Sequence, residues 1–205
     1  LPLDEGLAEH RRVKNSQDGW IVNRFVCPAS KLAELGDEPL RLSVVIDTGQ
    51  LPAADERIEA IEAAGIDPEV LFDAAPEVYY ELPLRHDVSF RVLQIDELGL
   101  RAKVRCGGSV LPSVPALAEF VQACRRLEVP FKATAALHHA VRSGDEHGFV
   151  NLLAASVFGD EEDALAEEDP SAFEVTPGAF RWRDREAATD EIARVRRELF
   201  VSFGS

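Results

Sequence analysis

The stretch Leu100–His139, LRAKVRCGGSVLPSVPALAEFVQACRRLEVPFKATAALHH, places a helical segment between two segments of alternating polarity. Residues 101–106 and 131–137 alternate apolar and polar side chains, which is the period of a β-strand. Between them, apolar side chains recur at helical spacing after Pro115, a residue suited to the first turn of a helix. The glycines at 107–108 provide a turn after the first strand. The stretch therefore predicts a strand–helix–strand unit with parallel strands.

The same two periods predict the elements on either side of this unit. We expect further strands at residues 20–27, 40–47, 78–82 and 179–183. Helices are expected at residues 3–14, 29–35, 55–64, 88–98, 148–158 and 184–203, and the acidic run at 160–169 is interpreted as a solvated loop or helix end.

Strands that alternate with helices predict an α/β fold with a parallel sheet and right-handed crossovers. We expect residues 1–205 to form a single domain, a TIM-barrel-like (β/α) barrel that is either complete or lacks strands. The alternative is an open, doubly wound parallel sheet. The barrel is favoured because the chain contains no strand–GxGxxG–helix or P-loop sequence, and because polar residues occupy the second faces of the strands, as they do near the mouth of a barrel.

The composition limits the partners. The chain carries 37 acidic and 22 basic residues, a net charge of −15, which argues against binding to nucleic acid or to an anionic membrane surface. No apolar run approaches the length of a membrane span. Three cysteines without metal-type spacing indicate a reducing cytoplasm. We predict no cofactor and a small anionic metabolite as the partner, and a homo-oligomer is compatible with these data.

Charged and hydroxyl side chains lie opposite the apolar faces of the predicted strands. They are Arg24, Asp47, Glu81, Lys103, Arg105, Lys132 and Thr134, with Arg181 and Arg183 as further candidates. In a barrel such residues converge at one end, where active sites are built. Their excess of cations, within an acidic protein, predicts a pocket for an anionic small molecule. The alternative is a set of structural ion pairs, Lys103–Glu81 and Lys132–Asp47.

Lys132 is the candidate nucleophile. Burial beside Lys103 and Arg105 favours the neutral amine that Schiff-base formation requires. Asp47 or Glu81 could then transfer the proton. In the alternative interpretation, Lys132 remains protonated and holds an anion.

The segments FKATAAL and AKVRCGG resemble the lysine-bearing strands of class I, Schiff-base aldolases of the deoxyribose-phosphate type, over about forty residues. The resemblance implies that Lys132 forms the imine, that Lys103 is its cationic neighbour, and that Gly107 and Gly108 hold an anion. The two strands occur in reversed order relative to the aldolases, and the histidines at 138–139 have no counterpart there.

A second resemblance covers most of the chain. The segments RFVCPASKLAEL, KVRCGG, PFKATAALHH, HGFVNLLAA and FVSFGS are similar to a family of bacterial and plant proteins that has no established activity. This resemblance implies a barrel-like fold and brings no reaction with it.

Three histidines are candidate ligand-binding residues. His138 and His139 follow a predicted strand, and His147 precedes a predicted helix. Together with Asp47 or Glu81 they could bind a divalent metal. Alternatively they make loop hydrogen bonds, or His147 helps to hold an anion at the helix N-terminus.

The leading hypothesis is a barrel enzyme of the lyase or aldolase type, which acts on a small anionic carbonyl compound through Lys132. A metal-assisted hydrolase or isomerase is the first alternative. A non-catalytic barrel that binds a metabolite or a partner protein is the second.

Overall fold

The computed structural model describes residues 2–17, 19–108 and 111–204, and these form two compact units, Leu1–Tyr79 and Tyr80–Ser205. The first unit contains α1 (Leu3–Lys14), β1 (Phe25–Pro28), the 3₁₀ helix η1 (Ala29–Leu35), β2 (Leu42–Val45), β3 (Ile58–Ala63), the 3₁₀ helix η2 (Pro68–Leu71) and the start of β4 (Glu77–Glu81). The predicted helices at 3–14 and 29–35 are confirmed, the second as a 3₁₀ helix.

The core of the first unit lies on one side of β1 and β2. Phe25, Cys27, Leu42 and Val44 are buried there together, and Leu7 of α1 packs against them. β1 and β2 are parallel, and β2 is in turn parallel to β3. Alternate residues of these short strands therefore provide the apolar face that α1 and η1 cover.

The helix predicted at residues 55–64 is wrong, because residues 58–63 form β3. The sequence IEAIEA places isoleucines three residues apart and is rich in glutamate and alanine, both of which favour helices. In the structure Ile61 pairs with Val44, and Ala60 is fully buried. Pairing with an adjacent strand, together with burial of its small side chains, has overridden the local helical preference.

The second unit contains α2 (Val88–Glu97), β5 (Arg101–Arg105), α3 (Val114–Leu127), β6 (Phe131–Thr134), α4 (Phe149–Phe158), α5 (Glu161–Ala166), the 3₁₀ helix η3 (Pro170–Ala172), β7 (Phe173–Val175), β8 (Ala179–Trp182), β9 (Arg185–Ala188), α6 (Thr189–Glu198) and β10 (Phe200–Gly204). The strand–helix–strand unit β5–α3–β6 is confirmed with parallel strands. Ser113 caps α3, and Pro115 lies in its first turn.

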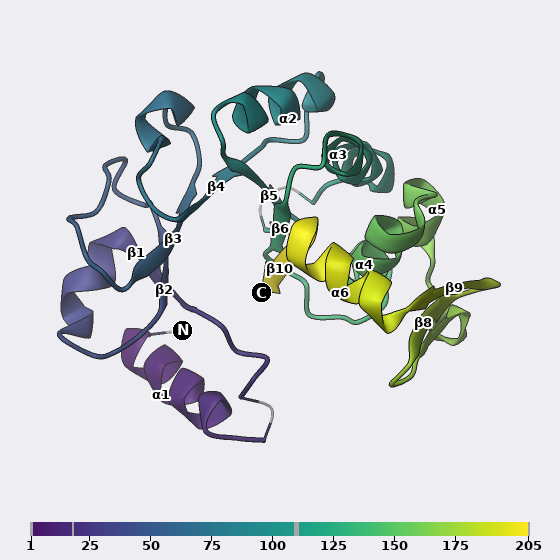
Figure 1. Cartoon of the computed structure of the whole chain (residues 1–205), viewed down its shortest axis with the longest axis horizontal. Helices are drawn as coiled ribbons and strands as arrows, with labels where there is room; N and C mark the ends of the chain where they lie inside the picture. Colours follow the sequence, from purple (N-terminus) through teal and green to yellow (C-terminus); the bar gives the residue numbers. More distant parts are fainter. Residues whose placement is uncertain (1, 18, 109–110, 205) are drawn as a thin grey trace. The chain divides into compact units, whose positions relative to one another are not determined.

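The helices of the second unit lie on one side of β5, β6 and β10 (Figure 1). Aromatic side chains fill this side: Phe131 of β6 meets Phe120 of α3 edge to face and stacks on Phe200 of β10. Phe120, Phe131 and Phe200 are almost completely buried. The odd-numbered residues of β6 therefore face the helices, and Lys132 and Thr134 face the other side of the sheet.

The C-terminal segment differs from its prediction in two ways. The strand expected at 179–183 exists as β8, but it pairs antiparallel with β7 and β9 and stands apart from the parallel sheet. The helix predicted at 184–203 is wrong at both ends, because it begins after β9 and stops before β10. β10 runs parallel to β6, so the chain returns to the main sheet at its end.

Hydrogen bonding orders the main sheet β1-β2-β3-β4-β5-β6-β10, and β7-β8-β9 form a separate three-stranded sheet. The protein is therefore α/β with a parallel sheet, as predicted. Among the described strands the order follows the sequence without the reversal that defines a doubly wound sheet. None of the helices in the described part of the chain is long and apolar enough to cross a membrane.

Candidate active site

A row of polar side chains runs across β4, β5, β6 and β10 on the sheet face opposite the helices of the second unit. Lys103 of β5 is the register partner of Lys132 of β6, and Lys132 is also the partner of Ser202 in β10. Glu81 joins the row from β4, because the backbone N–H of Leu82 donates to the carbonyl of Lys103. Four neighbouring strands thus present an acid, two amines and a hydroxyl side by side.

Both lysines of this row are buried. Lys103 is 5% exposed and Lys132 is 6% exposed. The Lys103 Nζ lies 3.1 Å from Glu81 Oε2, so this ion pair, one of the two expected under the structural alternative, is present. Burial of two lysines on adjacent strands is costly unless their surroundings compensate it, and the ion pair with Glu81 contributes to that compensation.

Arg105 and Thr134 form the next row toward the carboxyl ends of the strands. They are register partners, and the backbone N–H of Cys106 donates to the carbonyl of Thr134 at 2.7 Å. Within the described residues, the buried Thr134 Oγ1 has no hydrogen-bond partner. The guanidinium of Arg105 lies over Gly108, where a Cβ would come within 3.1 Å of Nη2. Gly108 also has a φ of 104°, which favours glycine.

The loops that follow β5 and β6 pack tightly against each other beside these residues. Ala135 and Ala136 both adopt left-handed backbone conformations, with φ of 64° and 53°. Gly107 lies against them, since a Cβ at residue 107 would be 2.2 Å from the Cβ of Ala136. Two consecutive left-handed non-glycine residues carry strain of about 1–3 kcal/mol each, and such strain gathers at functional sites.

His147 also holds these two loops together. Its Nε2 lies 2.8 Å from the carbonyl oxygen of Pro112, and its Nδ1 lies 3.3 Å from Nη1 of Arg142. The two contacts suit a neutral ring that donates from Nε2 to Pro112 and accepts from Arg142 at Nδ1. Burial, and then the charge of Arg142, lower the pKa of His147 against the opposing effect of the Pro112 hydrogen bond. His147 therefore acts in the structure as a loop clamp.

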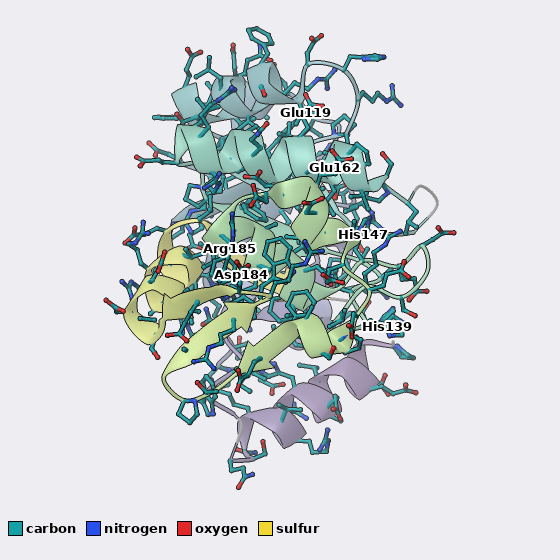
Figure 2. All side chains as sticks on the ribbon, turned by 90° about the vertical axis from the view of Figure 1, so that its right-hand side faces the viewer. Glu119, His139, His147, Glu162, Asp184 and Arg185 are labelled. Atoms are coloured by element: carbon teal, nitrogen blue, oxygen red, sulfur yellow. The ribbon has the colours of Figure 1, made fainter. Side chains whose placement is uncertain are left out.

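The three candidate histidines do not come together. His138 and His139 are exposed, and His139 Nε2 pairs with Glu146 Oε2 at 2.9 Å. Figure 2 shows His139 and His147 well apart. Within residues 2–17, 19–108 and 111–204, no group of three or more His, Cys, Asp or Glu side chains could hold a metal ion.

Two predicted site residues belong to the first unit and have partners there. Asp47 follows β2 and accepts hydrogen bonds from the N–H and Oγ of Ser30, at 3.0 and 2.5 Å, which lower its pKa. Arg24 lies between two carboxylates, 2.9 Å from Glu59 and 2.6 Å from Glu77. These pairs raise the pKa of Arg24 although its burial opposes the shift.

Sequence reasoning missed several residues of both units. In the first unit, Glu62 of β3 is 2% exposed and accepts from Ser43 Oγ at 2.7 Å. Because its segment was predicted as a helix, this carboxylate was not placed on a strand. In the second unit, Ser202 and the strained alanines at 135–136 were missed. Ser202 lies in FVSFG, a short segment rich in aromatic and β-branched residues, and that composition is the signal that could have identified β10.

A separate acidic hollow of about 490 Å³ lies between α3 and α5. Glu119 of α3 and Glu162 of α5 lie at it (Figure 2). Glu161 lines it as well, but its Oε1 is bound 2.9 Å from Nε of Arg125. The hollow is on the helical side of the unit, away from the sheet face that carries Lys132.

Comparison with known proteins does not assign the chain to a family: no family model matches it, and no curated protein matches it. The two resemblances stated from the sequence therefore remain predictions. The function has to be argued from the side chains of the site.

Proposed function

We propose that the protein is a lyase of the Schiff-base type, which binds a small anionic carbonyl compound and forms an imine with it through Lys132. The observation that supports this most is the buried pair Lys103–Lys132, in register on adjacent strands, with Glu81 Oε2 lying 3.1 Å from Lys103 Nζ. An amine held among other charges and away from water is suited to nucleophilic attack.

In the proposed reaction the amine of Lys132 attacks the carbonyl carbon, and the carbonyl oxygen leaves as water. The resulting iminium withdraws electrons from the neighbouring carbon–carbon bond. A hydroxyl on the far carbon of that bond gives up its proton to Glu81, the bond breaks, and an aldehyde leaves. Protonation of the remaining enamine and addition of water then release the second product and restore the amine.

We also propose that the parallel sheet is that of an incomplete TIM-barrel-like barrel. Its strands follow one another in sequence order, as barrel strands do. Arg105 and Thr134, in the row next to Lys103 and Lys132, are the last residues of β5 and β6, and the carboxyl ends of the strands are where barrel enzymes carry their chemistry. The three cysteines are buried free thiols, which suits the cytoplasm as the compartment of this enzyme.

Reduction with borohydride tests the imine. The protein is incubated separately with pyruvate, acetaldehyde and glyceraldehyde 3-phosphate, then reduced, digested and mapped by mass spectrometry. We expect a stable adduct on Lys132 with at least one of these compounds. Lys132→Arg keeps the positive charge but cannot form an imine, so it should lose the adduct.

The matched control is Lys31→Arg, which alters an exposed lysine that pairs with Glu34 in the first unit. It should leave the adduct on Lys132 intact. Circular dichroism confirms that both variants are folded. Absence of any adduct on Lys132, or equal labelling of Lys31 and Lys132, rejects the proposed reaction.

A further inference from the structure

We infer that Arg105 and Thr134 form a binding site for a carboxylate group, so that the substrate is a monoanionic oxo acid and not a sugar phosphate. This inference rests on the proposed function, because the carboxylate would belong to the compound whose carbonyl group reacts with Lys132. Arg105 and Thr134 are register partners, and both lie two residues beyond the Lys103–Lys132 pair. The strand rise separates the two rows by about 6–7 Å.

Both residues have hydrogen-bonding capacity to spare. The Thr134 Oγ1 is buried and has no hydrogen-bond partner among the residues that the structure describes, although a buried hydroxyl is normally hydrogen-bonded. Arg105 is exposed, and within the described ranges its guanidinium has no ion-pair or hydrogen-bond partner from the protein, in a chain that carries 37 acidic residues. An oxyanion between these two side chains would satisfy both.

The shape of the Arg105 side chain favours a carboxylate on the ligand. Glu81 pairs with Lys103, and Lys132 must be neutral when it attacks a carbonyl. Arg105 is the cation of the second row. Its planar guanidinium matches the two oxygens of a carboxylate, and the Thr134 hydroxyl adds a third donor. A phosphate monoester would bring a second negative charge, which the single guanidinium of Arg105 does not match.

Calorimetric titration with L-lactate and with inorganic phosphate tests the inference. L-Lactate has a carboxylate but no carbonyl, so its binding does not depend on an imine. We expect L-lactate to bind the unmodified protein more tightly than phosphate. Thr134→Val keeps the shape of the side chain and should weaken L-lactate binding about tenfold, since a hydrogen bond to a charged group is lost. Thr134→Ser should retain most of the affinity.

Arg105→Gln should weaken L-lactate binding tenfold or more. Arg126→Gln is the matched control, because it removes the same charge from an exposed position of α3, and it should have no effect. Tighter binding of phosphate, unchanged binding by Thr134→Val, or no binding of L-lactate would each overturn the inference. If L-lactate binds as expected but no adduct forms on Lys132, the proposed imine chemistry is rejected and the proposed carboxylate site is retained.

Discussion

At the scale of single residues, the partner of each polar side chain decides what that side chain can do. Asp47 and His147 were both candidates for chemistry, but Ser30 binds the first, and Pro112 and Arg142 bind the second. Thr134 differs from them, since its hydroxyl is buried without a partner in the described structure. Residue type and spacing could identify all three as polar positions, but only the folded chain shows which one is available to a ligand.

Burial of His147 between the two loops should make the free energy of unfolding depend on pH. Its folded-state pKa is lowered below the usual 6.5, chiefly by burial, so the unfolded chain binds the proton more readily. The stabilisation is therefore complete above about pH 6.5 and is lost as pH falls through the lowered pKa, by at most about 1.4 kcal/mol per pH unit. Urea unfolding of the wild type and of His147→Gln between pH 7.5 and 5 should show a shallower decline in the variant.

The exposed His138 provides the control for this measurement. His138→Gln should keep the wild-type dependence of unfolding free energy on pH. Identical pH profiles for the wild type and His147→Gln would contradict the assignment of His147 as a neutral buried clamp.

At the scale of elements, the loops after β5 and β6 behave as one packed unit. They meet where Cys106 N–H donates to the carbonyl of Thr134, where Gly107 lies against Ala136, and where His147 reaches Pro112. The glycine at 107 is explained by this close approach, since its φ is not in the left-handed region. The Gly-Gly pair was predicted as a turn, and the structure shows that its first member is needed for contact with the neighbouring loop.

This packing predicts a coupled pair of substitutions. Gly107→Ala would place a Cβ 2.2 Å from that of Ala136 and should destabilise the protein by about 1–3 kcal/mol. Adding Ala136→Gly removes the clashing methyl group and relieves a left-handed alanine, so the double variant should recover most of that loss. Urea unfolding of the two single variants and the double variant measures the coupling. Additive effects would show that the loops do not touch as described.

At the scale of the whole molecule, stability should vary along the chain with burial. Val104 of β5 and Ala133 of β6 are completely buried within paired strands. The connection at residues 48–54 has no regular structure and is mostly exposed. Opening the strands disrupts more of the structure than opening this connection does. The free energy of opening should therefore be higher for β5 and β6 than for residues 48–54.

Amide hydrogen exchange followed by mass spectrometry tests this gradient. Peptides that cover β5 and β6 should exchange most slowly, and peptides that cover 48–54 should exchange close to the rate of an unstructured chain. The α3 peptide provides an internal reference for a buried helix. Equal protection of residues 48–54 and β5 would contradict the described structure.

The sequence by itself determined the α/β class, the unit β5–α3–β6 and the face on which Lys103, Lys132 and Thr134 lie. These features follow from periodicity, because alternate residues of a strand point to opposite faces whatever surrounds it. Only the tertiary structure decided that residues 58–63 pair as β3 and that residues 200–204 return to the sheet as β10. It also decided that the Thr134 hydroxyl has no partner among the described residues, while Asp47 and His147 have theirs. The physical reason is that strand pairing and hydrogen-bond partners come from residues distant in sequence, and local propensity carries no information about them.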